Sequence, residues 1–157
     1  MKILIVASNN TKKSSFVIQQ ADSLIKKGIK IDYFWIKGKG VLGYLKNLFP
    51  LINKIKKSNC DIIHSHYGLS GLLSCFQFKK PVVTTYHGSD LNIPWVRFLS
   101  FFTIILSKKN IFVHKELLKK MPFLKYKSHI IPCGVDLNKL YHIDKNKAMS
   151  MMSLDSK

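Results

Sequence analysis

Polar residues follow three apolar runs of this sequence, at the points where buried strands would end. The first run leads into Ser8–Lys13, the second into His66–Gly68 and the third into His87–Asp90. Ligands of an open parallel α/β sheet bind outside the carboxyl ends of the strands. The sequence therefore predicts a pocket at that edge, lined by polar residues of these loops, Asn10 among them.

His87 is the residue of these loops best suited to chemistry. Its imidazole leaves a β-branched run, and Gly88 lets the backbone approach a ligand, which suits hydrogen bonding to a polar substrate. Asp90 would then orient a hydroxyl or cap a helix that begins near Pro94. The alternative is that His87 ends its strand and bonds to backbone, with Gly88-Ser89-Asp90 forming only a turn. The spacing favours neither interpretation.

Metal and cofactor sites are not predicted. His64 and His66 share one face of a strand, but zinc needs further ligands, and His87 is the one plausible neighbour. We therefore expect one histidine packed in the sheet and the other at its edge. The loop Ser8–Ser15 contains no glycine, which excludes a dinucleotide fingerprint and a Walker A loop.

The cysteines indicate a reduced, cytoplasmic setting. Cys60, Cys75 and Cys133 are an odd number at wide spacing, which argues against a disulfide framework and a four-cysteine zinc site. Cys133 has no base partner nearby in the sequence, so a small buried thiol is expected there. The apolar stretches are too short for a signal peptide or a membrane span.

Short apolar runs alternate with longer amphipathic ones, which is the pattern of strand and crossover helix in a parallel sheet. A first helix begins after Ser14 and stops before Gly28. Pro50 interrupts the stretch 41–57, so a kinked helix or two short ones are expected. The pattern predicts a doubly wound, Rossmann-like α/β domain with helices on both faces of a parallel sheet. The predicted strands are 2–7, 29–36, 61–65, 81–86, 110–113 and 129–131, and the other helices are 71–78, 93–107 and 115–120.

The chain has 157 residues and a formal net charge of +18, from 26 Lys and Arg against 8 Asp and Glu. Such a charge predicts attraction to nucleic acid or to an anionic membrane. Arg97 is the only arginine, which disfavours base-specific recognition of nucleic acid, and no nucleic-acid partner is expected. The lysine stripe between Lys46 and Lys57 would lie on an anionic bilayer, or its helix would cover the sheet with the lysines in water.

Three segments in this order resemble the family-4 glycosyltransferases of the GT-B fold. They are 61–68 (DIIHSHYG), 81–90 (PVVTTYHGSD) and 130–136 (IIPCGVD). The resemblance extends from Met1 to about Tyr141 and covers the N-terminal half of that family. It implies a two-domain enzyme in which the N-terminal domain mostly binds the acceptor. The C-terminal domain binds the nucleotide-sugar and supplies a Glu-x7-Glu pair.

The resemblance also implies roles for individual residues. His87 would contact the transferred sugar near the reacting centre as the catalytic residue, and Gly88, Ser89 and Asp90 would shape that wall. His66, Tyr67 and Gly68 would lie on the acceptor side. Such enzymes retain the anomeric configuration, usually without a metal, and many act at the inner membrane face.

We therefore expect the acceptor-binding half of a retaining enzyme that transfers a hexosyl group from a nucleotide-sugar to a carbohydrate or lipid-linked acceptor. The single glutamate, Glu116, cannot form the acidic pair, so activity would need a separate C-terminal domain. The domain is placed at 1–142, and 143–157 is interpreted as a linker or the start of a missing domain. The expected location is cytoplasmic, at most peripheral to the inner membrane face. The alternative is a non-catalytic module that binds glycan or an anionic membrane.

Overall fold

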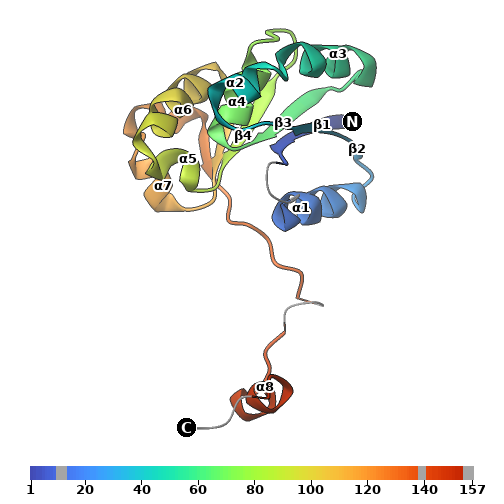
Figure 1. Cartoon of the computed structure of the whole chain (residues 1–157), viewed down its shortest axis with the longest axis vertical. Coiled ribbons are helices and arrows are strands. Elements are labelled where there is room, and N and C mark those ends of the chain that lie inside the picture. Colours follow the sequence, from blue (N-terminus) through green and yellow to red (C-terminus); the bar gives the residue numbers. More distant parts are fainter. Residues whose placement is uncertain (10–13, 138–140, 154–157) are drawn as a thin grey trace.

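The computed structural model describes residues 1–9, 14–137 and 141–153, and its centre is one open, twisted sheet (Figure 1). All strand pairs are parallel, in the order β2-β1-β3-β4-β5-β6. The chain reverses its direction of travel across the sheet between β1 and β3, as a doubly wound fold requires. This confirms the predicted fold class. The strands are β1 Lys2–Ser8, β2 Lys30–Ile36, β3 Ile62–His66, β4 Val82–Tyr86, β5 Lys109–Phe112 and β6 Ser128–Ile130.

The helices follow the predicted pattern, with three additional short elements. A single helical turn, α5, directly follows β4, a 3-10 helix precedes β6, and a short helix, α8, stands apart from the sheet (Figure 1). The last one lies within 143–157, where no helix was expected. The helices are α1 Ser15–Ile25, α2 Gly40–Leu45, α3 Leu48–Ser58, α4 Gly68–Cys75, α5 Ser89–Asn92, α6 Pro94–Leu106, α7 Lys115–Lys119 and α8 Lys145–Met151, with the 3-10 helix η1 at Pro122–Lys127.

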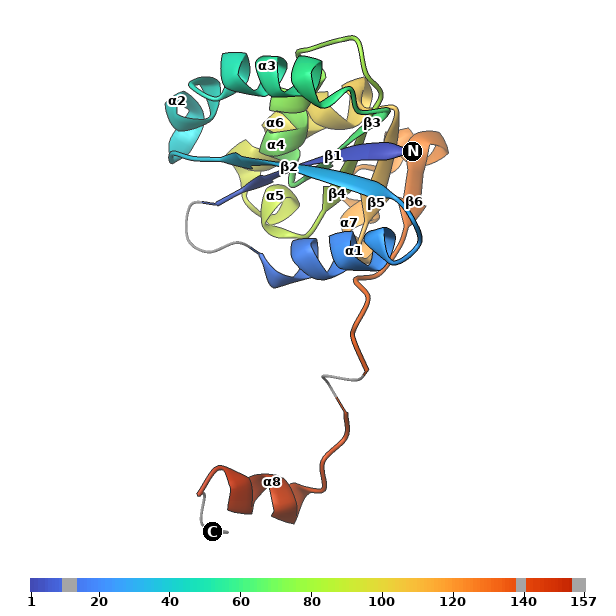
Figure 2. The same ribbon diagram turned by 90° about the vertical axis from the view of Figure 1, so that its right-hand side faces the viewer.

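Successive side chains of each strand point to opposite faces of the sheet, so the core has two parts, one on each face. On one face, Ile3 and Ile5 of β1 pack against Val17 of α1. On the other, Leu4 and Val6 pack with residues of α3 and α4. Figure 2 shows α1 on one side of β1 and β2, and α3, α4 and α6 on the other. α1 therefore covers only the β1 and β2 part of its face.

The stretch 41–57 forms two short helices, α2 and α3, which is one of the two predicted outcomes. Pro50 lies in the first turn of α3, where a missing amide hydrogen breaks no helical bond. Leu51 and Ile55 are buried in the core, whereas Lys46, Lys56 and Lys57 are exposed. α3 therefore covers the sheet, and the exposed lysines on and beside it lie in water. This agrees with one of the two interpretations given for the lysine stripe.

Two glycines let α4 pack closely against α6. A side chain at Gly68 would collide with Ser100, and one at Gly71 would collide with Thr103 and Thr84. α4 consequently begins at Gly68, three residues before the predicted start at Gly71. Gly68 is buried in this contact.

Candidate functional site at the carboxyl edge of the sheet

The site is built on the carboxyl ends of β3 and β4, which lie side by side. His66 is the last residue of β3 and pairs in register with Thr85 of β4. His87 follows β4 directly, so its ring reaches that of His66, and Nδ1 of His66 lies 3.0 Å from Nε2 of His87. Parallel pairing thus brings together two residues that are 21 positions apart in the chain.

Three imidazoles form a continuous stack at this edge. The ring centroids of His64 and His66 are 4.6 Å apart, and those of His66 and His87 are 5.3 Å apart. Nε2 of His64 lies 2.8 Å from the hydroxyl of Thr85. The rings bond to each other and to the sheet, and the described residues contain no group of three or more His, Cys, Asp or Glu placed to hold a metal ion.

Burial keeps these imidazoles uncharged. Desolvation lowers the pKa of His87 to about 4, and desolvation together with the nearby His87 lowers that of His64 to about 4. The pKa of His66 is lowered well below its ordinary value by desolvation and by both neighbouring histidines. At neutral pH each ring therefore has one N–H donor and one bare acceptor nitrogen.

The surroundings of His66 favour one arrangement of these protons. The short contact between His66 and His87 requires a single hydrogen, donated by either ring. Nε2 of His66 is buried and has no hydrogen-bond partner among the described residues. A buried N–H without a partner is rarer than a buried acceptor without one. We therefore expect His66 to donate from Nδ1 and His87 to carry its own proton on Nδ1.

Aromatic rings hold His87 in place. Its ring centroid lies 4.4 Å from that of Phe16 on α1 and 4.9 Å from that of Tyr67. Tyr67 has φ of 71°, a left-handed conformation that costs a non-glycine residue energy and is concentrated at functional sites. Burial and the nearby Asp90 raise the pKa of the Tyr67 phenol, which stays protonated.

Asp90 joins the loops that follow β3 and β4. Its side chain is buried, and its carboxylate accepts hydrogen bonds from backbone amides of Gly88 at 2.9 Å, Gly68 at 3.3 Å and His87 at 3.4 Å. Burial raises its pKa, and these amides oppose the rise. The residue before α6 is Ile93, so Asp90 does not cap that helix. Its oxygens therefore bind the loop that follows β3 to the loop that follows β4.

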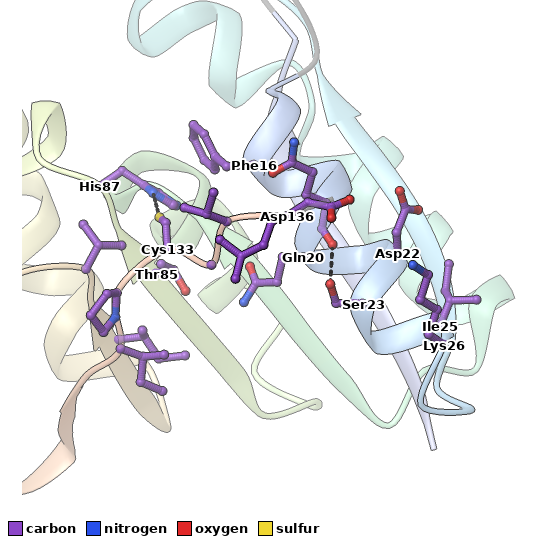
Figure 3. A pocket seen from close by; sticks show the side chains of 18 residues that line it. Phe16, Gln20, Asp22, Ser23, Ile25, Lys26, Thr85, His87, Cys133 and Asp136 are labelled. Carbon is purple, nitrogen blue, oxygen red and sulfur yellow. Dashed lines mark hydrogen bonds between the residues drawn. The ribbon is translucent and has the colours of Figure 1, made fainter. Parts of the chain in front are cut away.

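A cavity of about 850 Å³ opens beside His87 (Figure 3). It lies on the same face of the sheet as α1, over the part of that face that α1 does not cover. Thr85, Ile111 and Val113 form part of its lining, α1 forms one side, and the segment 131–137 forms another. Among the predicted site residues that the structure describes, His87 alone lines it. His66 and Tyr67 contact His87 from outside this lining, and Ser89 is exposed on α5. Asn10 lies outside the described residues.

Cys133 differs from the expected buried thiol. It is exposed, lines the cavity, and its Sγ lies 3.8 Å from Nδ1 of His87 (Figure 3). Partial burial raises the pKa of the thiol, so the pair is a neutral thiol beside a neutral imidazole. A nucleophilic cysteine needs a thiolate, which this environment disfavours.

Sequence reasoning also missed the α1 side of the cavity, where Phe16, Gln20 and Asp22 lie. A usable signal was present for Cys133, because Ile131-Pro132-Cys133-Gly134 follows a predicted strand and so reaches the same edge of the sheet. No comparable signal marked α1, whose position depends on how it packs.

Comparisons with known proteins agree with this architecture. Among curated proteins, none matches this sequence. Sucrose-phosphate synthase from Thermosynechococcus elongatus is similar in structure, with a TM-score of 0.76 at 15% identity over 98% of this chain and 53% of that one. The lipopolysaccharide outer core galactosyltransferase WaaB has a TM-score of 0.71 at 11% identity over 87% of this chain and 47% of that one. For UDP-GlcNAc 2-epimerase from Neisseria meningitidis, bound to UDP-GlcNAc, the TM-score is 0.63 at 13% identity over 83% of this chain and 45% of that one.

The chain thus spans about half the length of these solved structures. The sequence profile of Glycosyltransferase Family 4 matches residues 14–139, which include β4, His87 and the cavity segment 131–137. The chain belongs to glycosyltransferase family 4, and its sheet is an N-terminal Rossmann-like domain of the GT-B fold.

Proposed function

We propose that this domain is the acceptor-side half of a retaining glycosyltransferase that moves a hexosyl group from a nucleotide-sugar to a carbohydrate or lipid-linked acceptor. The observation that supports this most strongly is the position of His87. It follows β4 at the carboxyl edge, its ring is held by His66 and Phe16, and its Nδ1 is beside the cavity. A fixed donor at the mouth of a cavity is suited to an oxygen-rich ligand.

His87 acts by hydrogen bonding in this proposal. With a pKa of about 4 the imidazole is neutral at pH 7, so it does not serve as an acid. Its Nδ1–H, which lies 3.8 Å from Sγ of Cys133, turns from that weak acceptor to a hydroxyl oxygen of the sugar. A donor that is already oriented holds the sugar in place for transfer, so the contribution of His87 is to position the reacting sugar. His66 is a positioning residue, because it acts through the ring of His87.

The donor-binding carboxylates are expected from a second domain. Glu116, the only glutamate, lies on the surface at the start of α7, where Lys119 donates to it at 2.9 Å. It is therefore not available as half of an acidic pair. We expect the isolated domain to bind sugar weakly and to show no transfer. Robust turnover by the purified chain with UDP-glucose or UDP-galactose would contradict the proposal.

Sugar binding tests the role of His87 directly. UDP-glucose and methyl glucoside are titrated into the wild type, His87→Ala and His129→Ala, and affinities are taken from NMR shift changes. His129 is the matched control, since it is an exposed histidine that does not line the cavity. Loss of one hydrogen bond to a neutral donor predicts an affinity lower by roughly ten-fold for His87→Ala only. Equal affinities for all three proteins would reject His87 as a sugar contact.

A further inference from the structure

The outward face of α6 is apolar from end to end. Its buried residues, Val96, Ser100, Thr103 and Ile104, face the sheet and α4. The residues on its opposite side are exposed, and all are apolar. They are Trp95 at 52%, Phe98 at 64%, Phe101 at 38%, Phe102 at 43%, Ile105 at 41% and Leu106 at 45% exposure.

This face is continuous with further apolar and basic residues at the end of α6. A shallow pocket there is lined by Leu106 and Phe78 together with Lys79, Lys80 and Lys108. Phe78 is 77% exposed. Lys127 also lines this pocket, and its ammonium donates to the carbonyl of Ile105. The sequence has no acidic residue between Asp90 and Glu116, so α6 itself contributes no negative charge.

We infer that the outward face of α6, with Phe78 and the adjoining lysines, docks on the surface of an anionic membrane. Exposed apolar patches of this kind mark interaction surfaces. Aromatic side chains suit the boundary between headgroups and acyl chains, and lysine stems let the ammonium groups reach lipid phosphates. At 13 residues α6 is too short to cross a bilayer, and no described helix is long and apolar enough to do so.

The charge of the molecule favours a bilayer over a second copy of the chain. Two copies docked through α6 would bring two molecules of formal charge +18 together, with their lysines near one interface. An anionic surface carries the opposite sign and attracts each nearby lysine. The inference does not depend on the proposed sugar chemistry, because it uses none of the residues that line the cavity beside His87.

The membrane face and the cavity lie on opposite sides of the sheet. α6 packs over Tyr86 and Phe112, whereas the cavity is lined by Thr85, Ile111 and Val113, the alternate residues of the same strands. Figure 2 shows α6 and α1 on different sides of the strands. A membrane docked on α6 therefore leaves the cavity open. α6 begins only four residues after Asp90, so its first turn lies next to the edge that carries His87.

Vesicle cosedimentation tests this docking. The full chain is mixed with phosphatidylcholine vesicles with and without phosphatidylglycerol, over a salt series. We expect binding that requires phosphatidylglycerol and falls as salt rises, because screening weakens the attraction. Phe98→Ser with Phe102→Ser should lower the partition coefficient by on the order of ten-fold, because each buries apolar area in the bilayer. Both residues are exposed, so the core is unchanged, and thermal unfolding of the variant verifies this.

Two further variants keep the test sharp. Phe49→Ser on α3 is the matched control, since Phe49 is 76% exposed on the helix with the lysine stripe. It should bind like the wild type, and a loss equal to that of the α6 pair would overturn the assignment to α6. Lys79→Gln with Lys108→Gln should weaken binding and flatten its salt dependence. Absence of binding to any vesicle would also overturn the inference, as would a dimer in sedimentation velocity that the α6 pair disperses.

Discussion

The ring of His87 depends on neighbours from distant parts of the chain. His66 fixes one ring nitrogen, Phe16 and Tyr67 flank the ring, and Cys133 lies beside the other nitrogen. The sequence predicted that His87 stands at the rim, because a strand end can be recognised from its residues. It did not predict the proton arrangement. That arrangement depends on Nε2 of His66, which packing buries without a hydrogen-bond partner among the described residues.

We expect His87 of the wild type to carry its proton on Nδ1. Two-bond nitrogen–proton NMR correlations of labelled protein distinguish the two ring nitrogens. His66→Asn keeps an amide N–H near the position of Nδ1 and should preserve this tautomer of His87. His66→Phe removes the donor, so the proton of His87 should no longer be confined to Nδ1. A wild-type spectrum with the proton on Nε2 of His87 would refute the arrangement. An unchanged tautomer in His66→Phe would show that His66 does not set it.

The buried histidines make folding stability depend on pH. The folded state holds the pKa of His64 and His87 near 4, whereas unfolded histidine titrates near 6.5. The unfolded chain therefore binds protons first, and stability is lost as pH falls from about 6.5 towards 4, by about 1.4 kcal/mol per pH unit for each such histidine.

Urea unfolding across this pH range measures the loss. His64→Gln can keep the contact with Thr85 without titrating. The slope of the free energy of unfolding against pH should therefore be smaller, by the contribution of one proton. His129→Gln is the control, because His129 is exposed. The same slope in His64→Gln and the wild type would contradict this account.

At the scale of elements, hydrophobic periodicity predicted the sheet and the longer helices but not α5, η1 or α8. The six strands are recognisable from apolar runs and β-branched residues such as those of β4. α5 is a single turn that follows Gly88 at φ of 125°, which no pattern of apolar residues marks. The start of α4 at Gly68 was missed because glycine is a weak helix former, whereas Gly68 and Gly71 serve the close packing of α4 against α6. The cavity likewise depends on tertiary structure, because the segment that follows β6 crosses the end of β5 to bring Cys133 to His87.

Gly71→Ala should destabilise the domain although alanine is the better helix former. The added methyl group meets side chains of Thr103 and Thr84, and such overpacking costs about 1–3 kcal/mol, more than the gain of about 1 kcal/mol in helix propensity. Chemical denaturation measures the difference. Gly134→Ala is the control, since its new methyl group would meet nothing within 4 Å. Equal or greater stability for Gly71→Ala would contradict the tight α4–α6 contact.

At the scale of the whole molecule, two surfaces with different chemistry share one sheet. The cavity beside His87 combines polar groups of α1 with a neutral imidazole, and the outward face of α6 combines aromatic rings with adjoining lysines. Composition indicated an anionic partner from the net charge. It could not locate the surface, because the apolar stretch of α6 has the same composition as a fully buried helix. Exposure distinguishes the two, and it is set by how α6 packs on α4.

Isotope-filtered NOE spectroscopy shows whether a sugar binds beside His87. Labelled protein is mixed with unlabelled methyl glucoside, and contacts between sugar protons and protein protons are recorded. We predict contacts to the ring of His87, to Phe16 and to the β-protons of Cys133, which all line the cavity. Contacts confined to Trp95 and Phe98 of α6, with none to His87, would contradict the proposed sugar site.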